Sequence, residues 1–200
     1  VQTVYSYFYR FMKRFPTIHY LAAASIEDVY QLWQGLGYYS RARSLHKTAN
    51  DIVNTYDGVF PTDRNLLLKL PGIGPYTAAS IISLAFNKPE TVIDGNVTRV
   101  ICRMYGLTYP VDQIQTIIRD RATELTSQTR PADYASAIMD LGATICTPKN
   151  ANCSACPWSK QCLANKQGIQ EQIPVIKKLD KKIREENVYL ITNDTNKIFI

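Results

Sequence analysis

Apolar residues recur at helical spacing along most of the first 145 residues. The first apolar stripe predicts an amphipathic helix that ends near Phe15-Pro16. Its members are Val4, Phe8, Phe11, Met12 and Phe15. A second helix is expected to begin after Ser25, a residue type that caps helix N-termini, and to end at Gly35. This spacing predicts helices rather than strands.

The same pattern continues through the middle of the chain. A third stripe runs from Leu45 to Tyr56 and stops at Asp57-Gly58, and Thr62 is an expected cap for a short helix through Leu70. Four more helices are expected over residues 75–86, 96–105, 112–128 and 131–145. Because no convincing strand precedes Val188, the sequence predicts an all-α fold for this part.

The pattern changes near the end of the chain. Residues 170–186 carry many Lys, Arg, Asp and Glu without a sustained apolar face, which is typical of a linker. The final stretch, VYLITNDTNKIFI, predicts a strand, a turn and a second strand, and two strands are marginal alone. We therefore expect a helical domain over 1–168, a linker over 169–186 and the beginning of a β-containing domain over 187–200. The start at Val1, already inside an amphipathic pattern, adds the expectation that the sequence is part of a longer protein.

The composition excludes a membrane-spanning segment and does not identify a binding partner. The chain is 46% hydrophobic with a mean hydropathy of −0.18, and no apolar run approaches the ~18 residues of a membrane span. The net charge of +6 permits a polyanionic partner but does not require one. Because no secretion signal is present, we expect a cytoplasmic protein. Nothing in the sequence indicates a membrane partner or an oligomer, so a monomer is expected.

Four of the five cysteines fall close together as C-x6-C-x2-C-x5-C: Cys146, Cys153, Cys156 and Cys162. Structural zinc sites usually show two close Cys pairs, whereas only Cys153 and Cys156 form such a pair. A [4Fe–4S] cluster needs four thiolates and accepts wider spacing. The spacing favours iron–sulfur, with zinc as the alternative. Cys102 stands apart on an apolar helix face and is expected to be a buried core residue.

The segment Leu70-Pro71-Gly72-Ile73-Gly74 joins two expected helices. Glycines let the backbone approach a ligand closely, and the free amides of the following helix favour a phosphate. Such a turn binds the DNA backbone without reading sequence. The alternative is an ordinary tight turn between helices.

Asp94 lies between a short apolar run and the expected helix over 96–105. Its ordinary role is an N-cap, which Asp favours. A carboxylate beside a phosphate-binding turn would also stabilise positive charge developing on a sugar.

Together, LPGIGPYTA, the aspartate about twenty residues beyond it and the four-cysteine spacing resemble the helix-hairpin-helix DNA glycosylase superfamily with its iron–sulfur loop. The resemblance is narrower to the adenine DNA glycosylases of the MutY type. That narrower match is carried by three stretches: GLGYYSRARSLHK, VIDGNVTRV and MDLGATIC.

The resemblance implies hydrolysis of the N-glycosidic bond of adenine mispaired with 8-oxoguanine or guanine in double-stranded DNA. The base must first leave the stack. Asp94 matches the aspartate that stabilises the oxocarbenium-like sugar, and Asn96 and Tyr76 match positions lining that site. Tyr38 matches a tyrosine that wedges into DNA beside the lesion. Its alternative role is packing at a helix start.

Two features bear on activity. The endonuclease III branch of the superfamily has a Schiff-base lysine at the position of Tyr76. Because imine chemistry needs an amine, the tyrosine favours simple hydrolysis over a glycosylase that also cuts the strand. The resemblance places the family's general-acid glutamate just upstream of Val1, and Glu27 and Glu90 lie in the wrong segments to replace it. The 200 residues alone are therefore expected to be inactive or nearly so. A non-catalytic DNA-binding module remains a further alternative.

Overall fold

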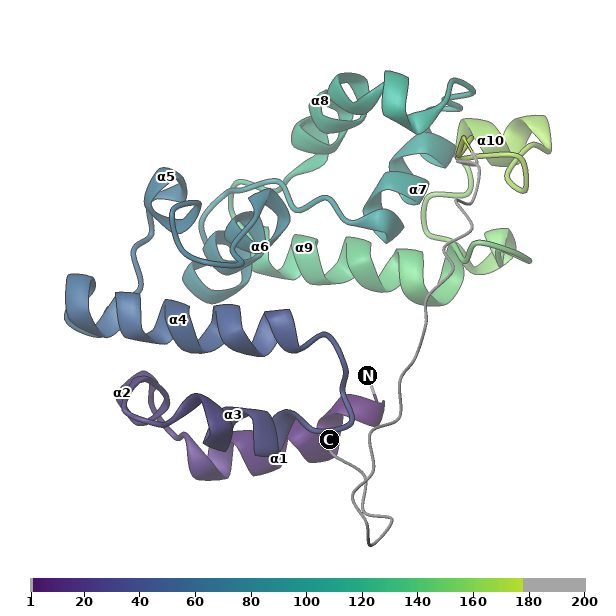
Figure 1. Cartoon of the computed structure of the whole chain (residues 1–200). Helices are drawn as coiled ribbons and strands as arrows, with labels where there is room; N and C mark the ends of the chain where they lie inside the picture. The colour runs from purple at the N-terminus through teal and green to yellow at the C-terminus, as the bar shows by residue number, and fades with distance from the viewer. Residues whose placement is uncertain (1, 178–200) are drawn as a thin grey trace, which may run out of the picture.

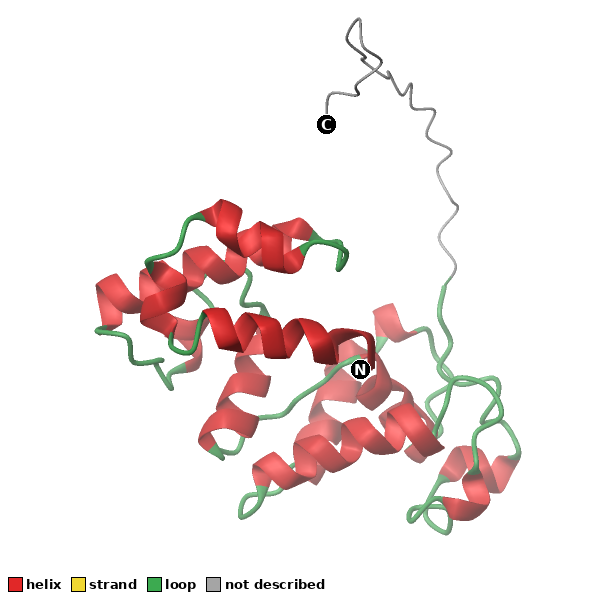
Figure 2. Cartoon of the chain, turned by 90° about the horizontal axis from the view of Figure 1, so that it is seen from below, coloured by secondary structure: helices red, strands yellow, loops and turns green. Residues whose placement is uncertain are grey.

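A computed structural model describes residues 2–177, and regular secondary structure in that range is entirely helical (Figures 1 and 2). The α-helices are α1 (Gln2–Arg14), α2 (Ile18–Ala22), α3 (Ile26–Trp33), α4 (Tyr39–Tyr56), α5 (Arg64–Leu67), α6 (Pro75–Ser80), α7 (Gly95–Met104), α8 (Gln115–Leu125), α9 (Pro131–Asp140) and α10 (Leu163–Gln167). Two π-helical segments, η1 (Ile81–Ala85) and η3 (Leu141–Ile145), extend α6 and α9. Two 3₁₀ turns are η2 (Val111–Gln113) and η4 (Cys153–Ala155). The predicted all-α class is confirmed.

The first four helices pack around one apolar cluster (Figure 1). Its buried members are Phe15, Leu21, Val29, Ala42 and Ala49. The long helix α4 contacts both α2 and α3, and its other side meets a second cluster formed with α5 and α6. Leu67, Leu70 and Ile82 belong to that second cluster. Helix α4 therefore holds the turn between α5 and α6 in place.

The later helices form the largest cluster, which is built on α7 and closed by α8, α9 and α10. Its buried members are Val97, Val100, Ile101, Cys102, Ile114, Ile118, Ala122, Ile138, Leu141, Ala164 and Ile173. Helix α9 crosses between the two halves of the molecule, since it contacts both η1 and α7 (Figure 1). The loop over residues 87–94 leads from η1 into α7, so it runs between the two halves.

Several element boundaries differ from the sequence-based expectation. Asp63, not Thr62, caps α5, because its carboxylate accepts from the amides of Asn65 and Leu66 at 2.8 and 3.0 Å. Helix α4 begins six residues before the Leu45 stripe, at Tyr39. The short helices α2 and α10 were not expected, since five residues carry too little periodicity to show a stripe.

The beginning of the expected linker contacts the helical domain. Ile173 is 2% exposed in the largest cluster, and Val175 forms an isolated parallel bridge with Pro110. Apolar side chains therefore anchor the beginning of a segment that carries many charged residues as a whole. The expected strands beyond Val188 lie outside the described residues. Within residues 2–177, no helix combines the length and apolar character that crossing a membrane requires.

Candidate functional site

The turn between α5 and α6 is held tightly against α4. Gly72 has φ +74°, in the left-handed region, and a Cβ built on it would lie 2.5 Å from the Cβ of Ser44. The Thr48 hydroxyl donates to the Pro71 carbonyl at 2.7 Å. Only glycine therefore fits at position 72, and the turn is a fixed feature rather than a mobile loop.

Space is open beside Gly74 in this turn. Gly74 is the N-cap of α6 with an extended backbone, and a Cβ built there meets nothing within 4 Å. Pro75 at the first helical position has no amide hydrogen, so the amides of Tyr76 and Thr77 are the ones without a partner in the helix, which favours an anion. The Leu70 side chain is 5% exposed and packs in the core. Of the five residues predicted to bind DNA here, Leu70 therefore has only its backbone near the surface.

Asp94 caps α7, and both of its carboxylate oxygens accept hydrogen bonds. Its Oδ1 accepts from the Val97 amide at 2.7 Å, and its Oδ2 accepts from the Asn96 side-chain amide at 3.2 Å. The capping role weighed from sequence is therefore confirmed, and the role toward a sugar stays a prediction. A fixed carboxylate of this kind stabilises developing positive charge without having to reorganise.

A buried arginine fixes Asn96 in turn. Arg99 is 8% exposed, and its Nη2 donates to Asn96 Oδ1 at 2.9 Å and to the Gly142 carbonyl at 2.6 Å. Its Nε donates to the Cys146 carbonyl at 2.7 Å. Burial lowers the pKa of Arg99 from its ordinary value, while the neighbouring Cys146 and Asp94 oppose that shift. Asp94 is therefore connected through Asn96 and Arg99 to the first residue of the cysteine loop.

The π-helical segment η3 makes this connection possible. A π-turn disturbs the regular carbonyl ladder of a helix, and the carbonyls of Gly142, within η3, and of Cys146, directly after it, accept from Arg99 here. Gly142 also lets α7 approach, since a Cβ built on it would lie 2.6 Å from the Asn96 Cβ. Sequence reasoning missed Arg99. The available signal was an arginine on an otherwise apolar face of α7.

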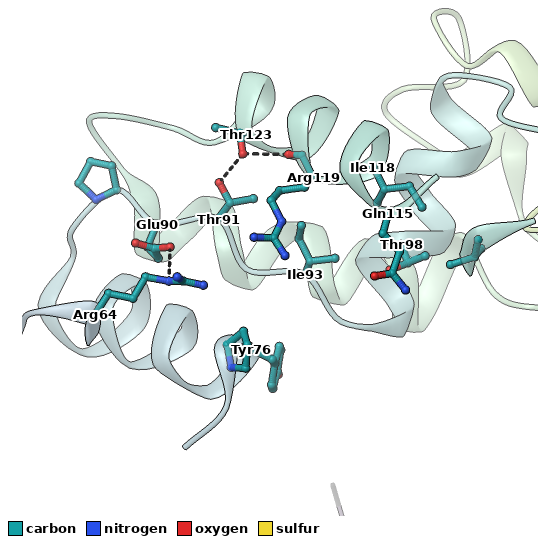
Figure 3. A pocket seen from close by; sticks show the side chains of 13 residues that line it. Arg64, Tyr76, Glu90, Thr91, Ile93, Thr98, Gln115, Ile118, Arg119 and Thr123 are labelled. Carbon is teal, nitrogen blue, oxygen red and sulfur yellow. Dashed lines mark hydrogen bonds and ion pairs between the residues drawn. The ribbon is translucent and has the colours of Figure 1, made fainter. Parts of the chain in front are cut away.

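Tyr76 lies in the first turn of α6, and its hydroxyl is 3.8 Å from the Met139 sulfur on α9. It borders a cavity of about 510 Å³ that continues over Ile93 and Thr98, which flank the Asp94–Asn96 segment (Figure 3). The structure therefore brings the turn and the neighbourhood of Asp94 to one cleft, although the two are about twenty residues apart.

Tyr38 is the N-cap of α4 and has a left-handed backbone, with φ 50° and ψ 49°. Its side chain is 73% exposed, and the Arg41 guanidinium lies 4.8 Å from the ring centroid. The ring does not pack into the core at the helix start, which was the alternative to a role in DNA binding. Its insertion into DNA stays a prediction.

The four clustered cysteines line one small cavity together with Arg103, and none forms a disulfide. Burial raises the pKa of the Cys153 thiol, with a smaller effect from the other three cysteines, and burial also raises the pKa of Cys156. Across residues 2–177, no group of three or more His, Cys, Asp or Glu side chains is arranged to hold a single metal ion. The donor set of four thiols around one space still fits a cluster larger than one ion.

Arg103 ties the cysteine loop to α7. It is 2% exposed, and its guanidinium donates to the carbonyls of Thr147, Pro148 and Ile173 at 2.7 to 3.2 Å and lies 3.4 Å from the Cys146 sulfur. Cys102, on the same helix, is fully buried, which raises its pKa to about 11. The expectation that Cys102 is a core residue is confirmed.

The glycine turn between α5 and α6 defines a helix-hairpin-helix protein, a class that binds the nucleic-acid backbone. An aspartate that caps α7 and a cysteine loop accompany this turn. The family described as "HhH-GPD superfamily base excision DNA repair protein" matches residues 1–122. The chain belongs to this superfamily, as its motifs predicted.

Relatives and solved structures agree with this assignment. The adenine DNA glycosylase of Homo sapiens is 43% identical over 178 residues, covering 86% of this chain and 32% of that protein. That of Buchnera aphidicola subsp. Schizaphis graminum (strain Sg) is 37% identical over 210 residues, covering 98% and 60%. The chain thus spans between a third and three fifths of the length of these relatives.

Among solved structures, a thermostable thymine-DNA glycosylase has a TM-score of 0.74 at 28% identity, covering 82% of this chain and 76% of that one. A non-covalent complex of endonuclease III with DNA has a TM-score of 0.71 at 25% identity, covering 84% and 78%. The fold of this chain is therefore the fold of DNA glycosylases.

Proposed function

We propose that this chain is the helical part of a base excision repair enzyme that hydrolyses the N-glycosidic bond of adenine mispaired with 8-oxoguanine or guanine. The observation that carries this proposal is the Asp94–Asn96 pair, held by Arg99 beside a turn with free helix-terminal amides. The 43% identity to the human adenine DNA glycosylase supports adenine as the base.

The chemistry follows from these positions. The turn around Gly74 holds the DNA backbone, and the exposed Tyr38 ring wedges into the DNA beside the lesion. Once the adenine has left the helix, the Asp94 carboxylate, held by Asn96 and the Val97 amide, stabilises the positive charge that develops on the sugar. Tyr76 supplies no amine for a Schiff base, which favours hydrolysis over strand cutting.

A polypeptide of these 200 residues alone is proposed to bind DNA with negligible glycosylase activity. A positioned proton donor contributes ~10²–10⁴-fold to the reaction rate. Glu90, the carboxylate at the cavity, pairs with Arg64 at 3.3 Å. Glu27 lies in the first turn of α3. Adenine release from an A:8-oxoguanine duplex at the rate of a full-length relative would overturn this proposal.

The proposed DNA binding is tested at Gly74. Substitution Gly74→Asp keeps a good helix cap and places a negative charge where the phosphate is proposed to lie. We expect affinity for duplex DNA to fall by about tenfold at low salt, with an unchanged melting temperature. Gln128→Glu adds the same charge at an exposed position after α8 and should have little effect. Equal affinities of the two variants would refute the proposed role of the turn.

We also propose that Cys146, Cys153, Cys156 and Cys162 hold a [4Fe–4S] cluster. Four free thiols around one cavity support a bound metal group, and the C-x6-C-x2-C-x5-C spacing favours a cluster over zinc. When bound, it would fix the cysteine loop on α7 next to Arg103. Broad visible absorbance with four irons per chain is expected. A colourless protein with one zinc would overturn the proposal.

A further inference from the structure

The cavity beside Tyr76 has a second wall that the proposed function does not use. Helix α6 contributes Tyr76 on one side, and α8 contributes Gln115 and Arg119 on the other (Figure 3). The side chains of Arg119 and Gln115 point from α8 into the space between the two helices (Figure 3). The cavity thus begins at the helix whose free amides form the proposed phosphate site.

The charge in this cavity is net positive because of Arg119. Arg64 lies 3.3 Å from Glu90, so these two opposite charges offset each other. Arg119 is exposed and makes no ion pair with any carboxylate in the part of the chain that the structure describes. An arginine without a partner facing a cleft is suited to bind an anion through two parallel hydrogen bonds.

Helix α8, one wall of the cavity, is fastened to the loop that leads into Asp94. Thr91, in this loop, donates its hydroxyl to the Thr123 hydroxyl at 3.1 Å (Figure 3). Thr123 in turn donates to the Arg119 carbonyl at 2.8 Å within α8. The wall that carries Arg119 and Gln115 is therefore tied to the segment that precedes Asp94.

We propose that Arg119 and Gln115 bind a second phosphate of the DNA strand whose neighbouring phosphate is held by the turn at Gly74. This inference rests on the proposed function, since it needs DNA to lie across the turn. Arg119 provides charge-assisted hydrogen bonds and Gln115 a neutral amide donor, both directed at phosphate oxygens. Such contacts set the position of the strand and carry no sequence information.

The experiment measures affinity of the 200-residue chain for an undamaged duplex between 50 and 200 mM salt. Each phosphate contact contributes about 0.9 to the slope of log affinity against log salt. Arg119→Ala should lower that slope by roughly one and weaken binding roughly fivefold to tenfold at the lowest salt. Arg121→Ala is the matched control, because Arg121 is on the same helix and is paired with Glu124 at 2.9 Å. It should leave the slope unchanged, and melting curves of both variants verify folding.

Four results would overturn the inference. Equal slope changes in Arg119→Ala and Arg121→Ala would show a general charge effect. If Gly74→Asp weakens binding and Arg119→Ala does not, this site fails while the proposed function stands; if neither weakens it, both fail. A dissociation constant for inorganic phosphate below about 1 mM that Arg119→Ala abolishes would assign the cavity to a free anion instead of a strand.

Discussion

Replacing Arg99 with alanine should destabilise the chain far more than replacing an arginine at its surface. Arg99 makes three hydrogen bonds of 2.6 to 2.9 Å, to Asn96 and to the carbonyls of Gly142 and Cys146. Alanine would remove all three and leave those acceptors without their partner in a buried region.

The magnitude follows from those contacts. Hydrogen bonds from a charged group contribute about 1.5–3 kcal/mol each, and three bonds at the lower end of this range give a gross loss of about 5 kcal/mol. Alanine also removes the cost of burying a polar group, which recovers about 2 kcal/mol. The net loss in the free energy of unfolding is about 3 kcal/mol. For a domain of this size it lowers the melting temperature by roughly 6–12 °C.

The assay is thermal unfolding followed by circular dichroism, with every variant in the same metal-loading state. Arg130→Ala is the control, since Arg130 is exposed and pairs with Asp133 at 2.7 Å on the surface. Exposed pairs of this kind contribute about 1 kcal/mol or less. Arg99→Lys keeps the charge but cannot reach all three acceptors, so an intermediate melting temperature is expected. If Arg99→Ala melts within about 2 °C of Arg130→Ala, the reasoning that this network holds Asp94 in place is wrong.

Three further results are expected. Gly72→Ala should lower the free energy of unfolding by about 1–3 kcal/mol, because φ +74° is strained for alanine and the new Cβ meets Ser44; unchanged denaturant midpoints would contradict this. Asp94→Ala should cost about 1 kcal/mol by removing the cap on the Val97 amide, whereas Asp94→Asn should not, so urea melts that rank the two equally would argue against the cap. Cys102 should resist alkylation of the folded chain at pH 8, because burial raises its pKa to about 11, and mass spectrometry showing rapid labelling there would count against a closed core.

Some local features followed from the sequence because short-range chemistry controls them. The Ser25 cap was predicted, and its hydroxyl accepts from the Asp28 amide at 3.1 Å. The turn at Gly72 was recognised from its residue types, which a positive φ demands. The cap at Asp63 was placed one residue early, at Thr62, because two neighbouring residues of capping type compete and only the backbone path decides between them.

The sequence by itself determined the helical class, the family and the candidate residues, because helical periodicity, glycine turns and cysteine spacing are written in neighbouring positions. It left Asp94 between two roles, and the tertiary structure showed the cap, with Oδ1 on the Val97 amide and Oδ2 on the Asn96 side chain. Arg99 and the α8 wall with Arg119 came only from the fold. Arg99 acts on residues more than 40 positions away, and Arg119 faces a helix about as far from it along the chain. No local pattern specifies which distant carbonyl or cavity an arginine will meet once the two halves pack around α9.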